Sequence, residues 1–248
     1  MCNIISFFGG DTQVGTTMVS QSVATCLSKN KKKVLLMLCS GNYGDDYLNF
    51  SADHSLDDIK VNLSSNNICK EDVDGILINQ GDIKVLPGVK DITRVKYYKE
   101  DDVGKITSVI KGDYDYIIID AGSNVNYGIN ISSLLEADKV YFIVTQQEKS
   151  IRRFINTYYK VLYPLNIMGK VINNKYKEEY GNNSLLELEE VIGRGDFINI
   201  NYTSDSWIAE IKHSTLLNDG KYKSGIMEII GDITGDYFKK NRFSLFNR

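Results

Sequence analysis

The sequence predicts an α/β fold with three layers, in which a mostly parallel sheet is flanked by helices on both faces. Short apolar runs of strand length alternate with helical patterns along nearly the whole chain, as in repeated strand–helix–strand units. The runs are apolar at almost every position, which is typical of strands that helices cover on both sides. No linker rich in Pro, Gly or Ser and no internal repeat divides the chain. We therefore expect residues 1–248 to form a single domain.

Six runs have the length and apolar character of buried strands: Ile4–Phe8, Val34–Leu38, Ile83–Leu86, Tyr116–Ile119, Val140–Thr145 and Ile167–Ile172. Four segments carry apolar residues at the spacings of three and four that place them on one helical face. These predicted helices are Thr17–Lys29, Lys149–Leu162, Asn183–Ile192 and Gly225–Lys240.

The composition limits the classes of function. A hydrophobic content of 42% in 248 residues is enough for a sizeable core, and a net charge of −3 is too small for bulk attraction to nucleic acid or to an anionic membrane. Four cysteines without a C-x-x-C pair, together with two histidines, predict no zinc site. The N-terminus lacks the pattern of a signal peptide, and no apolar run approaches the ~20 residues that span a bilayer. We expect a cytoplasmic protein with reduced thiols.

An acidic segment, Asn42–Asp58, contains five aspartates and three aromatic residues. Its spacing lacks the D-x-[DN]-x-[DN]-G order of a calcium-binding loop. We therefore expect a helix with exposed carboxylates here and not a metal site.

The residues after the first strand match most of a phosphate-binding loop. From Gly10 the spacing follows G-x-x-x-x-G-K-[ST], except that Thr16 occupies the lysine position. Backbone N–H groups and the positive end of the following helix hold phosphate in such loops, and neither depends on that lysine. The alternative is that Gly9, Gly10 and Gly15 only shape a turn between strand and helix.

A nucleotide in this loop would meet a run of consecutive residues: Gly10, Asp11, Thr12, Gln13, Val14, Gly15, Thr16, Thr17 and Met18. The strand Tyr116–Ile119 ends at Asp120 in the manner of a Walker B strand. Thr17 and Asp120 are therefore the candidate ligands of Mg²⁺. The alternative is that Asp120 caps the turn that follows it. We assign no catalytic residue.

Five segments in the correct order resemble the ParA/MinD family of deviant Walker ATPases: Val34–Ser40, Val85–Gly88, Tyr114–Asp120, Leu134–Gln146 and Gly169–Asn173. The resemblance covers nearly the whole chain. It implies a P-loop NTPase-like fold, ATP or ADP with Mg²⁺ as the ligand, and a homodimer. It also implies that Asn173 faces the adenine base.

The chain departs from the family at its charged positions. The family loop reads Lys-Gly-Gly-x-Gly-Lys-Thr-Thr, and Asp11–Met18 stands in its place. Asp11 replaces the lysine that reaches across the family's dimer interface, and Thr16 replaces the phosphate-binding lysine. The family's Asp-x-Asp after the second strand becomes Leu38–Ser40. Phosphoryl transfer depends on positioning and charge, so we expect the ATPase activity to be weak or absent.

Loss of the loop lysine resembles the TadZ/CpaE group, which helps to place Tad-type pilus machinery. That resemblance implies a localisation or assembly scaffold with pilus or secretion proteins as partners. Two alternatives stay open. One is an active ATP-dependent switch for positioning or for DNA partitioning, and the other is an interaction module that works without nucleotide.

The C-terminal residues 236–248 form a basic, aromatic tail. Its composition resembles the membrane-binding helices that end MinD-like proteins, which implies peripheral contact with the inner face of the cell membrane. The alternative is that its aromatic side chains pack on the core. Arg152 and Arg153 supply too few phosphate contacts for non-specific DNA binding, so we expect no DNA partner.

Overall fold

The computed structural model describes residues 2–50, 53–181, 183–192 and 197–235. One eight-stranded sheet runs through it. Its strands are β1 (Asn3–Gly9), β2 (Val34–Leu38), β3 (Ile78–Gln80), β4 (Ile83–Leu86), β5 (Tyr116–Asp120), β6 (Lys139–Val144), β7 (Lys170–Tyr176) and β8 (Ile198–Asn201). They are ordered β3-β4-β2-β5-β1-β6-β7-β8, and every pair is parallel except β3–β4. The predicted fold class is confirmed.

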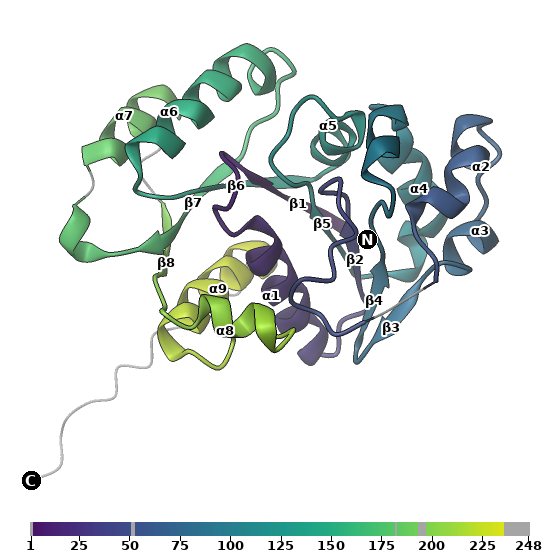
Figure 1. Ribbon diagram of the computed structural model, residues 1–248, viewed down its shortest axis with the longest axis horizontal. Coiled ribbons are helices and arrows are strands. Elements are labelled where there is room, and N and C mark those ends of the chain that lie inside the picture. The colour runs from purple at the N-terminus through teal and green to yellow at the C-terminus, as the bar shows by residue number, and fades with distance from the viewer. Residues whose placement is uncertain (1, 51–52, 182, 193–196, 236–248) are drawn as a thin grey trace, which may run out of the picture.

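Helices cover both faces of this sheet (Figure 1). They are α1 (Thr16–Lys29), α2 (Lys60–Ser64), α3 (Lys70–Asp74), α4 (Asp102–Ile110), α5 (Gly128–Leu135), α6 (Glu148–Thr157), α7 (Asn183–Ile192), α8 (Ser206–Ile211) and α9 (Gly220–Thr234). Helices α1, α8 and α9 lie on one side, and α2 to α7 lie on the other.

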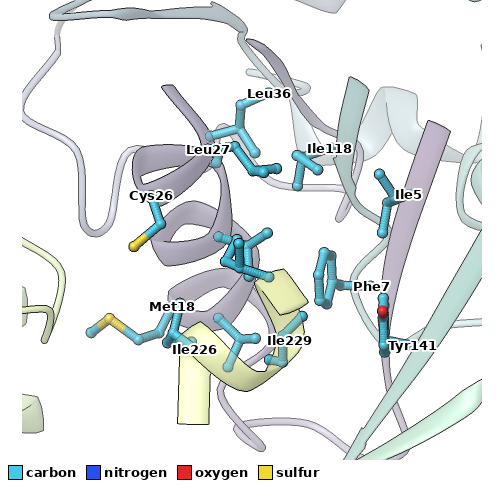
Figure 2. Packing of buried hydrophobic residues seen from close by; sticks show 14 of the residues in the cluster. Ile5, Phe7, Met18, Cys26, Leu27, Leu36, Ile118, Tyr141, Ile226 and Ile229 are labelled. Atoms are coloured by element: carbon cyan, nitrogen blue, oxygen red, sulfur yellow. The ribbon is translucent and has the colours of Figure 1, made fainter. Parts of the chain in front are cut away.

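Successive residues of the central strand β1 point into different parts of the core. Ile5 and Phe7 pack into the cluster that α1 and α9 complete, while Ile4 and Phe8 belong to clusters on the opposite face. Figure 2 shows Phe7 and Tyr141 of the sheet beside the α9 helix, with their two rings stacked at a centroid distance of 5.2 Å. Burial on both faces accounts for the nearly continuous apolar character of the strand sequences.

The strand order brings several loops to one edge of the sheet. Strand β5 pairs with both β1 and β2, and the β1–β5 register places Phe7 opposite Asp120. The strand order reverses at the centre of the sheet. From β1 the chain continues through α1 to β2 on one side of β1, whereas β6 lies directly beside β1 on the other side. Ligands of open α/β sheets bind outside the carboxyl ends of the strands at such a point.

Two local predictions differ from the structure. The strand predicted at Ile167–Ile172 is observed at Lys170–Tyr176, so it begins and ends later. The helix predicted within Asn42–Asp58 is wrong, because residues 41–50 form an irregular loop. Gly41 and Gly44 adopt positive φ angles of 94° and 88°, which interrupt a helix. We call residues 41–50 the acidic loop.

The last described helix, α9, overlaps the predicted segment Gly225–Lys240 but begins earlier. The Asp219 side chain caps its N-terminus by accepting hydrogen bonds from the amides of Lys221 and Tyr222. The C-terminal tail at 236–248 lies outside the described residues, and so does its predicted membrane contact. Within the described ranges, no helix combines the length and the apolar character needed to cross a membrane.

Candidate functional site

A cavity of about 720 Å³ opens at the carboxyl edge of the sheet. Its walls come from the loop after β1, the first turn of α1, the acidic loop, and the segments after β5, β7 and β8. Helix α8 closes one side through Ser206 and Glu210. We call this space the first cavity. It lies where the fold is expected to hold a ligand.

The loop after β1 is fixed by its backbone. The amide of Gly10 donates to the carbonyl of Ile143 at 2.8 Å. A Cβ atom on Gly10 would lie 2.8 Å from the Cβ of Phe154, so only glycine fits against α6. Gly15 precedes α1 at φ 93°, and no side chain caps the helix or places an acid in its first turn. This leaves the positive N-terminal end of a 14-residue helix open to the first cavity.

Thr17 and Asp120 form a direct pair beneath this helix end. The Thr17 hydroxyl donates to Oδ2 of Asp120 at 2.7 Å, and the Gly122 amide donates to Oδ1 at 3.1 Å. Burial raises the pKa of Asp120 to about 6, although both hydrogen bonds favour the charged form. A hydroxyl and a carboxylate at this position fit the oxygen ligands that Mg²⁺ prefers. A magnesium ion held there would neutralise phosphate charge.

The charges of the lining oppose a free polyphosphate. Among the described residues of the first cavity, Asp11, Asp46 and Glu210 are acidic and Lys175 is the one basic residue. The Lys175 ammonium donates to the Gln13 carbonyl at 2.8 Å, so it lies against the phosphate-binding loop. A nucleotide in this cavity would therefore need a metal ion to offset the repulsion between its phosphates and these carboxylates.

The conformation of Lys175 is unusual. Its φ angle is 58°, and the pairing of β7 with β8 shifts register between Asn173 and Tyr176. Bulges of this kind re-aim side chains and are common beside functional sites. The bulge therefore places the Lys175 ammonium against the loop, whose own sequence contains no basic residue.

Asp11 is turned toward a basic partner. Its carboxylate accepts hydrogen bonds from Nη1 of Arg153 at 2.8 and 3.0 Å and from the amide of Thr12 at 2.8 Å. The side chain of Asp11 is only 14% exposed. This ion pair offsets the repulsion that Asp11 would exert on a bound phosphate.

Most of the predicted nucleotide-contacting residues line the first cavity: Asp11, Thr12, Gln13, Gly15, Thr16, Thr17 and Met18. Gly10 and Val14 lie outside its lining, and the Asp120 carboxylate lies behind Thr17. Asn173 also lies outside the lining, because its side chain is buried and donates to Asn199 at 3.0 Å.

The neighbouring Asn174 lines the cavity instead. Its amide group donates to the carbonyl of Val14 at 2.7 Å and lies where a Cβ atom on Gly15 would be. Sequence reasoning missed Asn174 and Lys175. The family pattern has one asparagine at the end of this strand, and either Asn173 or Asn174 can be aligned with it. Only the observed bounds of β7 show which of the two side chains faces the cavity.

The acidic loop was also missed as part of the site. Gln21 donates to the carbonyl of Gly44 at 2.9 Å, and the Tyr47 hydroxyl donates to Glu210 at 3.2 Å. These bonds hold the acidic loop over α1 and against α8. No local sequence signal predicts a contact between residues as distant in the chain as Tyr47 and Glu210.

The two positions where the ParA/MinD pattern has aspartates are Leu38 and Ser40. Leu38 is fully buried, and Ser40 lines the first cavity. Neither side chain is a carboxylate that could orient or deprotonate water. Cys39 between them is fully buried, and burial raises the pKa of its thiol to about 12, so the thiol stays neutral near pH 7.

No family model matches the chain, and no curated protein sequence matches it. Solved structures do match. A ParA family ATPase from Chlorobium tepidum TLS is 19% identical with a TM-score of 0.77, covering 92% of this chain and 98% of that one. The septum site-determining protein MinD from Pyrococcus horikoshii OT3, complexed with Mg-ADP, is 15% identical with a TM-score of 0.75 over 94% and 96%.

A third match is the MinC:MinD cell division complex of Aquifex aeolicus, at 21% identity and a TM-score of 0.74, covering 94% of this chain and 96% of that one. Identities this low demonstrate a shared fold. The chain therefore has the fold of the ParA/MinD-type P-loop ATPases.

Proposed function

We propose that this protein binds ATP or ADP with Mg²⁺ in the first cavity and hydrolyses ATP slowly or not at all. The observation that carries the proposal is the Thr17–Asp120 pair at 2.7 Å beneath the uncapped N-terminus of α1. This pair and this helix end would supply metal and phosphate contacts like those of a P-loop, although the loop has no lysine. The MinD match that holds Mg-ADP supports the choice of ligand.

Slow hydrolysis follows from the charges that remain. In P-loop enzymes a lysine and a metal ion stabilise the charge of the transferred phosphoryl group. Here Lys175 is the basic residue of the described lining, and its ammonium is engaged by the Gln13 carbonyl. Leu38 and Ser40 stand where the family pattern has its two aspartates, so the water-orienting carboxylate is lost as well. Each loss lowers the rate by orders of magnitude.

We infer that the protein acts as a homodimeric localisation or assembly scaffold of the TadZ/CpaE type, with pilus or secretion proteins as its partners. The resemblance of the lysine-free loop to that group supports this role. The MinC:MinD complex supports the use of this fold as a docking platform. Such a scaffold would act in the cytoplasm, and residues 236–248 would provide peripheral contact with the membrane.

A working ATP-dependent positioning switch is the second candidate, and Lys175 favours it. An ammonium at the loop could move from the Gln13 carbonyl to a phosphate and replace the missing lysine. The net acidic lining favours the third candidate, an interaction module that needs no nucleotide. Nucleotide binding and turnover separate the three.

The test compares two threonines of the same helix. ATP binding is measured with and without Mg²⁺ for the wild type, Thr17→Ala and Thr25→Ala, and phosphate release is followed in the same samples. Thr25 is a matched control because its hydroxyl donates to the Gln21 carbonyl at 2.8 Å, within α1, and lies outside the first cavity.

We expect Thr17→Ala to weaken the magnesium-dependent part of ATP binding about tenfold or more, since hydrogen bonds to charged groups are worth about 1.5–3 kcal/mol. Thr25→Ala should bind as the wild type does. Phosphate release by the wild type and by Thr25→Ala should not exceed phosphate release by Thr17→Ala. Turnover by the wild type that Thr17→Ala abolishes would establish the switch, and absence of magnesium-dependent binding in the wild type would leave the interaction module.

A further inference from the structure

A second cavity, of about 580 Å³, lies on the other side of the phosphate-binding loop. Its walls are residues 11–14 of the loop, residues 145–147 after β6, the first turns of α6 and the end of β7. Its volume lies in the range of small-molecule pockets. None of the roles proposed above uses it.

The charge of this second cavity is the opposite of the first. Four basic side chains line it, from Lys149, Arg153, Lys175 and Lys177, against a single acid, Asp11. The described lining of the first cavity has three acids and one base. Two cavities that share a loop therefore have opposite preferences for ligand charge.

Helix α6 directs its N-terminus into the second cavity. Gln147 occupies the cap position and forms no side-chain cap hydrogen bond. The ten residues of α6 are enough for a helix dipole that favours anions at this end.

Two buried hydroxyls in the lining are left unpaired. Ser150 and Thr145 are 2% and 7% exposed, and neither hydroxyl has a hydrogen-bond partner within the described ranges. Buried polar groups are nearly always satisfied, so two unpaired hydroxyls in the lining of one cavity point to a ligand that would satisfy them. Both hydroxyls can donate to an acceptor such as a phosphate oxygen.

The basic residues differ in how they are held. Lys149 is exposed and forms no ion pair with any described residue. Lys177 lies over the rings of Tyr180 and Tyr202, at 5.0 and 4.4 Å, and donates to the Tyr180 hydroxyl at 3.1 Å. The Lys177 ammonium also forms an ion pair with Glu179 at 3.6 Å.

We propose that the second cavity binds a small phosphorylated anion, held by the α6 N-terminus, Lys149 and Lys177, and by the Ser150 and Thr145 hydroxyls. The recognition is of phosphate charge and oxygen geometry, since the lining presents mainly cations and polar groups. This proposal does not rest on nucleotide binding in the first cavity.

Pyrophosphate is the probe, titrated by calorimetry into the full chain in EDTA. Without Mg²⁺ the acidic first cavity does not favour it. Lys149→Gln/Lys177→Gln removes two cations that line only the second cavity. Lys84→Gln/Lys111→Gln removes two exposed lysines that line neither cavity and is the matched control. Thr17→Ala reports on the first cavity.

We expect saturable pyrophosphate binding that Lys149→Gln/Lys177→Gln weakens about tenfold or more, since hydrogen bonds to charged groups carry the affinity. The control pair and Thr17→Ala should bind within about twofold of the wild type, because they leave every such bond in place. The proposal fails if the wild type does not bind, if Thr17→Ala abolishes binding, or if both lysine pairs weaken it equally.

Amide NMR spectra provide a second readout that does not depend on the variants. Pyrophosphate added to the wild type should shift the amide signals of Gln147 to Ser150 before those of the α1 N-terminus. Shifts confined to residues 15–18 would place the anion in the first cavity and overturn the proposal.

Discussion

At the scale of single residues, the site depends on close packing around the loop backbone. Gly15 adopts φ 93°, and a Cβ atom there would lie 2.4 Å from Nδ2 of Asn174. That same Nδ2 donates to the Val14 carbonyl at 2.7 Å, while Lys175 donates to the Gln13 carbonyl. Residues at the end of β7 therefore fix two carbonyls of the loop and with them its backbone conformation.

Replacement of Gly15 by alanine tests this arrangement. Gly15→Ala should lower the free energy of unfolding by about 1–3 kcal/mol, because it forces an L-residue into a left-handed conformation. It should also displace Asn174 and weaken magnesium-dependent nucleotide binding. Denaturant unfolding and nucleotide titration measure the two effects.

Gly112→Ala is the control, since a Cβ atom at Gly112 has no neighbour within 4 Å and its φ is not positive. It should change the free energy of unfolding by less than about 0.5 kcal/mol. Equal effects of the two substitutions would show that the Gly15 conformation has no special role.

At the scale of elements, a single carboxylate connects helix α9 to the sheet. Asp232 of α9 accepts a hydrogen bond from Tyr141 at 2.5 Å and forms ion pairs with Lys139 at 3.2 Å and Lys170 at 3.3 Å. The Asp232 side chain is 14% exposed. It therefore ties α9 to both β6 and β7, next to the apolar contacts of Ile226 and Ile229 shown in Figure 2.

The pKa of Asp232 makes this tie sensitive to acid. Burial alone would raise the pKa, but the Tyr141 hydrogen bond and the two lysines outweigh it and lower the pKa below its ordinary value of 3.8. A carboxyl group with a lowered folded-state pKa contributes stability above its unfolded-state pKa and loses it as the pH falls through the folded-state value.

Asp232→Asn should therefore lower the free energy of unfolding at pH 7 by about 1–3 kcal/mol, and the difference from wild type should shrink as the pH falls below 3.8. Denaturant unfolding at several pH values measures this. Asp74→Asn, at an exposed position, is the control. A deficit that stays constant down to acidic pH would contradict the ionic contribution.

The elements that could be predicted from sequence are those with continuous apolar runs. Strands β1, β2, β4 and β5 were predicted nearly to the residue, because burial on both faces leaves an unambiguous pattern. Strands β3 and β8 were missed because they are short and carry polar residues: Ile78–Gln80 and Ile198–Asn201.

The same contrast holds within the site. The loop and Asp120 were found from local spacing. Asn174, Lys175 and Glu210 were not, because a bulge and contacts between distant segments place them. The spacing of apolar residues in the sequence predicts neither a bulge nor a contact between distant segments.

At the scale of the whole molecule, the fold places two cavities of opposite charge on either side of one loop. The first cavity has the Thr17–Asp120 pair and an acidic lining, so the ligand that we propose for it is a nucleotide with its metal ion. The second has a basic lining and needs no metal. The central claim is that the first cavity binds nucleotide through backbone and metal, without a loop lysine.

Calorimetry with ATP, with and without Mg²⁺, tests that claim most directly. Lys149→Gln/Lys177→Gln is the protein to use, since it leaves the first cavity intact and removes two cations of the second. We predict saturable Mg-ATP binding weaker than about 100 μM, or roughly −5.5 kcal/mol, and none in EDTA. Absence of heat at millimolar Mg-ATP, or equal affinity without Mg²⁺, would contradict the account.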